Sequence, residues 1–311
     1  MSLEVTGLLC MAYGSPAGEE GIEPYYTHIR GGRKPSAAAL EELKGRYRAI
    51  GGSPLTAITR AQAAAIGERL GLPSFVGMKH ASPFVSDGAA EAEQAGVRRL
   101  VGLPLAPHYA EMSLGAYERS LQESWDGELI FVRGFHDHPA FIRAVRQLLS
   151  ERLDEHWPER LFFTAHSLPA RIVSQGDGYA DQLMESCRLV AAGMKLPAWE
   201  LAYQSASTTG EPWLGPDLLT AIEKSGARDV LVCPIGFVAD HLEILYDLDV
   251  EAQQFARRRD LKIRRTESFN TRPDFISDMA EVVEDALGTF PSPRSGERVR
   301  ERGKGKSSHT N

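Results

Sequence analysis

The sequence predicts an α/β protein with two similar Rossmann-like domains, each a parallel sheet flanked by helices. Three observations lead to this prediction. Short apolar runs alternate with helical patterns along the chain, which is typical of parallel sheets. The runs are almost continuously apolar, as in strands that helices cover on both faces. Finally, the second half of the chain repeats local features of the first half in the same order.

The individual elements follow from these patterns. Clear strands are expected at Gly7–Ala12, Arg98–Pro104, Leu161–Ala165 and Val230–Pro234, and weaker ones at Ser74–Met78, Leu129–Val132 and Leu201–Gln204. Helices are expected at Ser36–Ile50, Arg60–Leu70, Asp87–Ala95, Pro139–Asp154, Ala180–Ala192, Asp217–Lys224 and Asp274–Leu287.

Two pairs of segments indicate a duplicated unit. Gly96–Pro104 and Gly226–Pro234 share a glycine, an apolar strand and a final proline at the same spacing, and Ala12–Pro16 resembles Ala165–Pro169. We therefore expect domains at residues 1–150 and 151–288 with the active-site cleft between them. The terminal helix could pack back on the first domain, and residues 289–311 are expected to form a disordered basic tail.

The composition is that of an ordinary globular protein and argues against nucleic-acid binding. The 311 residues are 42% hydrophobic and 25% charged, and the net charge is −7. From Pro291 onward, six basic and two acidic residues give the tail a charge of +4, so the rest of the chain carries −11. An acidic body does not suit nucleic acid, and the tail is interpreted as a solvated terminus rather than an interaction arm.

The cysteines and the hydropathy limit the cofactors and the compartment. Cys10, Cys187 and Cys233 include no Cys-x-x-Cys pair, so neither a cysteine zinc site nor an iron–sulfur cluster is expected. The first residues lack the parts of a signal peptide, and no window reaches the roughly 18 apolar residues of a transmembrane helix. We therefore expect a cytoplasmic protein without membrane insertion.

Ligands of open parallel sheets bind beyond the carboxyl ends of the strands. That rule selects Tyr13, His108, His166 and the segment Gly236–Glu243, each of which closely follows a predicted strand or stands at its end. Two facing halves would place Tyr13 and His166 on opposite walls of one cleft. A lone histidine at a strand end is more often structural, but a neutral imidazole can accept a proton or bind Fe(II).

Three carboxylates follow the last of these strands. Glu243, Asp247 and Glu251 recur every four residues and would share one face of a helix, for which Asp240 is a candidate N-cap. A solvated acidic face and a site for a hydrated divalent cation are equally supported by this spacing. The chain contains no Gly-x-Ser-x-Gly, Walker A or Gly-x-Gly-x-x-Gly motif, which argues against a serine hydrolase and a nucleotide site.

A basic and aromatic segment stands out in this acidic chain. Residues 24–35 read PYYTHIRGGRKP, and Arg46 and Tyr47 precede a turn that contains Ser53. Arginines beside glycine-rich turns suit the capture of carboxylate or phosphate groups. A solvated loop beside an ordinary helix explains the segment equally well.

Taken together, these segments resemble the ferrochelatase family, and most closely its soluble bacterial coproporphyrin ferrochelatases. The resemblance covers most of the chain in family order and leaves out only the tail. The matching stretches are GLLCMAYGSP (7–16), PYYTHIRGGRKP (24–35), GRYRAIGGSPL (45–55), GMKH (77–80), AHSLPARI (165–172), YADQL (179–183), WLGPDL (213–218) and PIGFVADHLEILYDLD (234–249).

The resemblance implies the insertion of Fe(II) into a porphyrin with release of two protons. It implies that His166 and Glu243 are the catalytic, metal-binding pair and that Tyr13 is the axial ligand of the product iron. Asp247 and Glu251 would form an outer cation site, with Mg²⁺ as a candidate accessory ion, or a proton relay. The residues implied to bind the porphyrin are Tyr13, Arg30, Arg46, Tyr47, Ser53 and Tyr117.

Two departures from the family narrow the expectation. The chain lacks the cysteine set of cluster-containing members, and its Tyr25–Lys34 lip is polar and basic rather than apolar. The polar lip favours coproporphyrin III, which has two more carboxylates than protoporphyrin IX. We therefore expect a monomeric enzyme of haem synthesis without a tightly bound cofactor, in transient contact at most with other enzymes of that synthesis.

Two kinds of alternative remain. The chain could serve protoporphyrin IX or another metal and tetrapyrrole, such as cobalt or sirohydrochlorin. It could also be a non-catalytic haem or porphyrin carrier with Tyr13 as the iron ligand. The roles of His80, His108 and His241 stay open.

Overall fold

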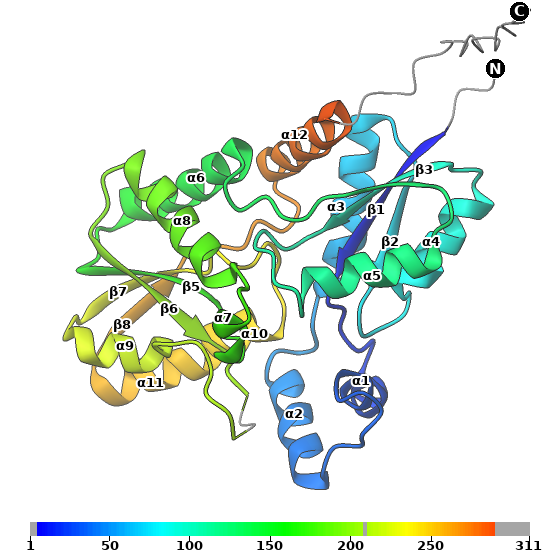
Figure 1. The fold of residues 1–311 in the computed structure, drawn as a ribbon. Coiled ribbons are helices and arrows are strands. Elements are labelled where there is room, and N and C mark those ends of the chain that lie inside the picture. Colours follow the sequence, from blue (N-terminus) through cyan, green and yellow to red (C-terminus); the bar gives the residue numbers. More distant parts are fainter. Residues whose placement is uncertain (1–4, 208–209, 290–311) are drawn as a thin grey trace, which may run out of the picture.

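The computed structural model describes residues 5–207 and 210–289, and its two sheets have the same strand order (Figure 1). The first sheet runs β2-β1-β3-β4 and the second β6-β5-β7-β8, and every pairing is parallel. The strands are β1 (Thr6–Ala12), β2 (Ser74–Met78), β3 (Arg99–Pro104), β4 (Glu128–Phe131), β5 (Arg160–His166), β6 (Ala198–Gln204), β7 (Asp229–Cys233) and β8 (Lys262–Arg265). The repeated order confirms the predicted pair of similar α/β units.

Helices cover both sheets, as the apolar strands predict (Figure 1). In the first half they are η1 (Glu19–Gly21), α1 (Ile22–Ile29), α2 (Ala37–Ala49), α3 (Leu55–Leu70), α4 (Val85–Gln94), α5 (Leu114–Ser124) and α6 (Pro139–Glu155). In the second half they are α7 (Arg171–Ser174), α8 (Tyr179–Ala192), α9 (Leu218–Ser225), α10 (Leu242–Leu245), η2 (Asp247–Glu251), α11 (Ala252–Arg259) and α12 (Pro273–Thr289). The predicted basic tail lies outside the described residues, apart from the end of α12. No helix in the described ranges is long and apolar enough to cross a membrane.

The expected acidic helix after β7 is wrong in two respects. The segment is divided into the short helix α10 and the π-helix η2, in which the Glu251 amide donates to the Tyr246 carbonyl at 2.8 Å. Asp240 does not cap α10, since His241 occupies that position. The Asp240 carboxylate instead accepts hydrogen bonds from Ser268 and Asn270.

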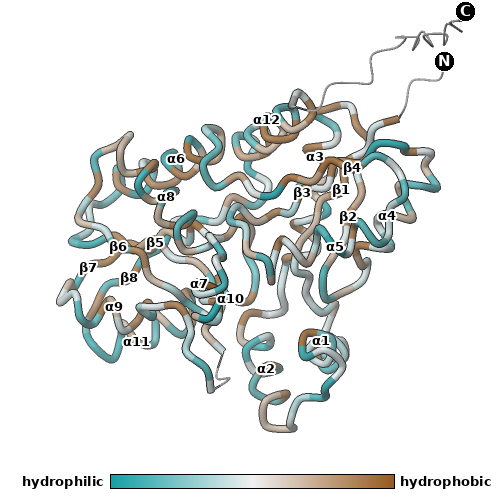
Figure 2. The backbone as a smooth tube through the Cα atoms, in the orientation of Figure 1, coloured by the Kyte–Doolittle hydropathy of each residue, from teal (hydrophilic) through white to brown (hydrophobic). Residues whose placement is uncertain are grey.

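One apolar cluster runs through both halves of the molecule. It joins Leu8 of β1 and Phe163 of β5 through Phe141 of α6 and Phe275 of α12, all of them fully buried. Figure 2 shows the hydrophobic strands at the centre of each half. Helix α12 packs against α3 and α6, so the terminal helix connects the two halves.

Helices α1 and α2 form a small unit that projects from the first sheet (Figure 1). Its interior consists of Ile22, Tyr25 and Tyr47, which are buried together. Leu242 of α10 packs against this cluster from the second half. The projecting unit of the first half and α10 of the second half therefore meet beyond the strand ends.

Candidate active site

His166 and Glu243 lie next to each other at the carboxyl ends of the strands of the second sheet. His166 is the last residue of β5, and Glu243 lies in the first turn of α10. The distance from His166 Nε2 to Glu243 Oε1 is 3.4 Å, and both side chains are about one-third exposed. His166 Nδ1 contacts the Ser167 carbonyl, which leaves Nε2 directed at the carboxylate.

The backbone around this pair is held from several sides. Tyr179 Oη donates to the His166 carbonyl at 2.9 Å, and Gln204 Nε2 donates to the Glu243 carbonyl at 2.7 Å. The Gly236 amide donates to the Thr164 carbonyl at 3.0 Å, which brings the loop after β7 against β5. A Cβ at residue 236 would come within 2.5 Å of the Ala165 Cβ, so this approach requires glycine.

The pair is an ion pair at neutral pH. Burial acts to lower the pKa of His166, but the charge and hydrogen bond of Glu243 outweigh it and raise the pKa to about 9. Burial acts to raise the pKa of Glu243, and the positive charge and hydrogen bond of His166 hold it well below its ordinary value. The pair therefore holds one proton, on His166, beside the Glu243 carboxylate.

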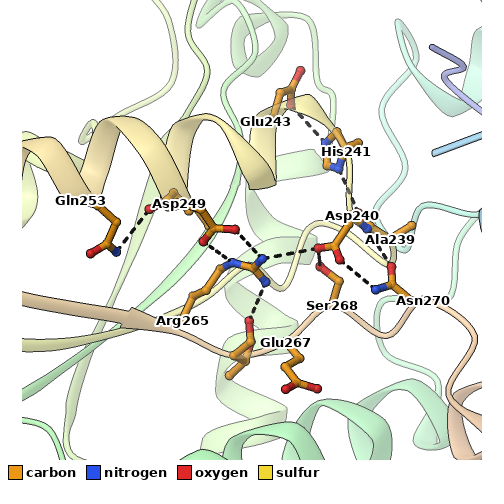
Figure 3. A network of polar contacts seen from close by, with 12 residues as sticks. Ala239, Asp240, His241, Glu243, Asp249, Gln253, Arg265, Glu267, Ser268 and Asn270 are labelled. Carbon is orange, nitrogen blue, oxygen red and sulfur yellow. Dashed lines mark hydrogen bonds and ion pairs between the residues drawn. The ribbon is translucent and has the colours of Figure 1, made fainter. Parts of the chain in front are cut away.

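His241 approaches the same carboxylate from the other side. Its Nε2 lies 3.7 Å from Glu243 Oε2, and its Nδ1 lies 2.9 Å from the Ala239 carbonyl (Figure 3). Glu243 thus has an imidazole near each oxygen. His241, left open by the sequence, belongs to the site.

Asp247 lies one turn further on and is 8% exposed. Ser205 Oγ donates to its carboxylate, and Arg46 of α2 approaches it at 3.8 Å from the first half. Burial and the charge of Glu243 raise the pKa of Asp247 to about 7, although Ser205 and Arg46 act in the opposite direction. A carboxyl group with this pKa can exchange protons near neutral pH.

The structure offers limited support for the outer cation site. Within the described residues, no group of three or more His, Cys, Asp or Glu side chains is arranged to hold a metal ion. Glu251 is exposed, and it acts on Asp247 through its charge, which raises the Asp247 pKa further. The outer cation site at Asp247 and Glu251 stays a prediction.

Opposite the His166–Glu243 pair, Tyr13, Tyr25 and Tyr47 form an aromatic surface, here called the tyrosine wall. Tyr13 follows β1 directly, is 42% exposed, and packs edge-on against Tyr25 and tilted against His80, at centroid distances of 6.5 and 4.5 Å. Tyr25 in turn packs edge-on against Tyr47 and donates to the Gly14 carbonyl at 3.2 Å. Reduced solvation and the negative charge of Glu243 raise the pKa of Tyr13, which shows that the two walls share one electrostatic environment.

The remaining predicted residues surround this wall at different depths. Arg46 stacks on Tyr246 at 5.1 Å besides approaching Asp247, and therefore touches both halves. Ser53 lines a cavity of about 490 Å³ together with Tyr47. Tyr117 is buried on α5 and lines a second cavity of about 320 Å³. Arg30 is exposed at the end of α1, where it stacks on Tyr26 of the same helix at 5.7 Å.

The structure adds residues that sequence reasoning missed. Lys79 lines the Tyr117 cavity, and burial together with the charge of Arg119 lowers its pKa to about 8. Lys79 was within the GMKH match but was not singled out. Gln204 ends a weakly predicted strand and Ser205 follows it, and neither belongs to a motif, so no signal identified them. His108 is buried against Ser186, with Nε2 and Oγ 2.9 Å apart, and links the two halves.

Known proteins are similar in sequence to this chain over nearly its whole length. The family model described as Ferrochelatase matches residues 5–287. The chain is 40% identical over 304 residues to the coproporphyrin III ferrochelatase of Geobacillus sp. (strain WCH70), which covers 91% of this chain and 98% of that one. It is 40% identical over 309 residues to the enzyme of the same name from Bacillus subtilis (strain 168), with 93% and 100% covered. A protein named ferrochelatase from Thermus thermophilus is 38% identical, with 90% and 98% covered.

Solved structures share the fold at low sequence identity. SirB from Bacillus subtilis with Fe³⁺ matches with a TM-score of 0.58 and 9% identity, and covers 91% of this chain and 95% of that one. CbiX, described as the terminal enzyme of sirohaem biosynthesis in denitrifying bacteria, matches with a TM-score of 0.57 and 12% identity, with 90% and 99% covered. At these identities the likeness establishes the two-unit fold alone.

Proposed function

Because the chain belongs to the ferrochelatase family, we propose that it inserts Fe(II) into coproporphyrin III and releases two protons. The protein is thus a metal chelatase of haem synthesis, and the proposal concerns its substrate and the residues that act on it. This proposal rests on the His166–Glu243 pair, whose nearest side-chain atoms are 3.4 Å apart, opposite the tyrosine wall. A flat macrocycle between these walls would present one face to the pair and the other to Tyr13.

The pair supplies both a base and metal ligands. Insertion removes two pyrrole protons while a cation sheds water, so a proton acceptor must stand near the ring centre. Since His166 already carries a proton at neutral pH and holds the pKa of Glu243 well below its ordinary value, neither group accepts a pyrrole proton until the His166 proton has left. The approach of Fe(II) would lower the pKa of His166, and its proton would pass to solvent, since the side chain is about one-third exposed. The neutral Nε2 would then be free to accept a pyrrole proton or to bind the metal.

Protons need a way out of the cleft, and Asp247 is placed to provide one. It follows Glu243 by one turn, and its pKa of about 7 permits both uptake and release at neutral pH. Arg46 and Ser205 hold its carboxylate in place. This supports the relay role for Asp247 and Glu251, and a Mg²⁺ site at the same carboxylates is the alternative.

Polar groups at the periphery suit a substrate with four propionates. Arg30, Arg46, Tyr47, Ser53 and Tyr117 are the proposed contacts, with Tyr13 as the axial ligand of the product iron. Arginine binds carboxylates through paired N–H donors, so the two additional carboxylates of coproporphyrin III find partners on a polar lip. The lip itself carries Arg30, Arg33 and Lys34 within ten residues of Tyr25. We further propose that the protein works as a monomer in the cytoplasm.

The experiment is anaerobic incubation of the full chain with Fe(II) and either coproporphyrin III or protoporphyrin IX, following the free-porphyrin absorbance. Rapid loss of free coproporphyrin with a much slower reaction of protoporphyrin supports the proposal. Equal rates would overturn the substrate assignment. Tight binding of coproporphyrin or haem without insertion would instead favour a carrier, and insertion of cobalt into sirohydrochlorin would favour the other chelatase class.

A further inference from the structure

We infer that Arg265 is a positioning residue for Glu243, because it ties together both ends of the segment Asp240–Asp249. Glu243 is the charged partner of His166 in the proposed function, and the inference rests on that function. Arg265 touches neither Glu243 nor His166 in the contacts of the described structure. Its action is through the backbone that carries Glu243, His241 and Asp247.

Arg265, the last residue of β8, binds the far end of this segment with both arms of its guanidinium. Nε donates to Asp249 Oδ1 at 2.8 Å and the terminal nitrogen Nη2 to Oδ2 at 2.7 Å (Figure 3). The same Nη2 lies 3.6 Å from Asp240 Oδ1 at the near end. One side chain, 18% exposed, therefore bridges two carboxylates that flank the catalytic turn.

Asp240 is itself fixed in a precise orientation. Ser268 Oγ donates to its carboxylate at 2.6 Å and Asn270 Nδ2 at 2.9 Å, while the Asp240 amide donates to Asn270 Oδ1 at 2.8 Å (Figure 3). Both partner residues follow β8 closely, so one strand and its loop hold the near end. A carboxylate held in this way transmits the position of Arg265 to the adjoining His241 and Glu243.

The segment between the two carboxylates cannot hold its own shape. Helix α10 has only four residues and continues into the π-helix η2, and helical segments this short are unstable without tertiary contacts. Gln204 fixes the Glu243 carbonyl, and Leu242 packs on the projecting helices. His166 and His241 contact the Glu243 carboxylate itself, and the two ends that Arg265 joins add a restraint on the backbone that carries it.

The geometry also requires arginine. Its planar fork binds Asp249 through two nitrogens and still reaches Asp240, whereas the single ammonium of lysine cannot make all three contacts. Arg264, the preceding residue, pairs with Asp229 at 2.5 Å and has no contact with the segment among those described. Arg264 therefore offers a matched control on the same strand.

The test compares Arg265→Lys with Arg264→Lys in the full chain. For Arg265→Lys we expect kcat with Fe(II) and coproporphyrin III to fall about 10- to 100-fold, as when partners that orient catalytic ligands are removed. The dissociation constant for coproporphyrin, measured by fluorescence in the absence of iron, should stay within about twofold. Hydrogen exchange of amides 241–251 should accelerate in this variant alone. Arg264→Lys should leave all three quantities close to those of the wild type.

A second variant guards against simple misfolding. Asp249→Asn removes the negative charge and one of the two acceptor oxygens while leaving Arg265 in place, and it should reproduce the loss in kcat. Combining it with Arg265→Lys should add little, because both changes break one interaction. Unchanged kcat and exchange in Arg265→Lys would overturn the inference, as would a parallel loss of porphyrin binding and folding. If the wild type inserts no iron, the proposed function fails, and the exchange of amides 241–251 alone decides the inference about Arg265.

Discussion

The chemistry of the cleft depends on how one imidazole is oriented. His166 Nδ1 contacts the Ser167 carbonyl, so Nε2 is the atom that a metal or a pyrrole proton would meet. We predict that His166→Ala lowers the rate of iron insertion at least about 100-fold, the lower range for loss of a positioned acid–base group. Porphyrin binding should persist, since the proposed propionate contacts lie elsewhere.

The measurement is anaerobic insertion kinetics beside porphyrin fluorescence titration. His156→Ala is the matched control, because His156 pairs with Asp229 at 2.6 Å at the opposite end of β5. The control should insert iron at nearly the wild-type rate. Normal turnover in His166→Ala would exclude His166 from the reaction.

The ion pair also makes stability depend on pH in a defined window. His166 has a pKa of about 9 in the folded protein against an ordinary 6.5, because Glu243 outweighs the opposing effect of burial. A raised pKa stabilises the fold fully below pH 6.5, and this stabilisation disappears as the pH rises to about 9. Glu243→Gln removes the cause of the raised pKa.

We therefore predict that the free energy of unfolding falls more steeply from pH 6.5 to 9 in the wild type than in Glu243→Gln. Urea denaturation at pH 6.5, 7.5 and 9 measures both slopes. The substitution also removes the part of the raised Asp247 pKa that Glu243 causes, and this change acts in the same direction. Parallel slopes would mean that the pair does not form in solution.

At the scale of elements, the close approach of the loop after β7 to β5 brings the pair together. Gly236→Ala would place a Cβ 2.5 Å from Ala165 Cβ and 2.9 Å from its Cα, so the backbone must move. We predict a loss of about 1–3 kcal/mol in the free energy of unfolding, as for overpacked sites, together with reduced insertion activity. Urea denaturation and the insertion assay measure the two effects.

Gly45→Ala is the matched control for this substitution. Gly45 is exposed inside α2, and a Cβ there meets no atom within 4 Å. Alanine in a helix interior should stabilise the protein by up to about 1 kcal/mol. Equal effects of the two substitutions would mean that Gly236 has no special packing requirement.

The elements that the sequence predicts are those with a strong apolar signal. All seven expected strands are present, with boundaries within three residues. β8 was missed because three of its four residues are basic and only Ile263 is buried. α5 was missed because Leu114, Tyr117 and Leu121 give its polar sequence only a narrow buried face. Helix α3 begins at Leu55 rather than Arg60, because the turn at Pro54 leads directly into it.

The features of the site also fall into those that the sequence predicts and those that it does not. His166, Glu243 and Tyr13 stand at or just after strand ends, where the topology of parallel sheets predicts a ligand. Their spacing and protonation could not be predicted, because these depend on Gly236, Gln204 and Tyr179 from separate elements. The expected single helix after Asp240 was also wrong, since the segment is divided into α10 and a π-helix, whose Asp249 binds an arginine from β8. Such contacts join residues that are distant in sequence and carry no local motif.

At the scale of the whole molecule, the two halves are joined away from the cleft as well as across it. Gln62 of α3 is fully buried and donates to the Asn270 carbonyl at 2.8 Å, in the loop after β8. His108 and Ser186 join the halves at a second place, and α12 packs against α3 and α6 at a third. These contacts fix the distance between the tyrosine wall and the His166–Glu243 pair.

Because one apolar cluster crosses both halves, they should unfold together. Phe275 of α12 is fully buried within this cluster and stacks on Phe269 at a centroid distance of 4.5 Å. We predict that Phe275→Ala lowers the free energy of unfolding by about 3–5 kcal/mol, the usual result of such a cavity. The loss should appear in one transition that involves both sheets.

Two variants that each keep one tryptophan, Trp125 in the first half or Trp199 in the second, report the two sheets by fluorescence during urea denaturation. Glu284→Ala, on the exposed side of α12, is the control and should change stability by less than about 0.5 kcal/mol. Separate midpoints for the two tryptophans would show that the halves are independent, and the wall-to-wall distance would then have to be set by the ligand rather than by the shared core.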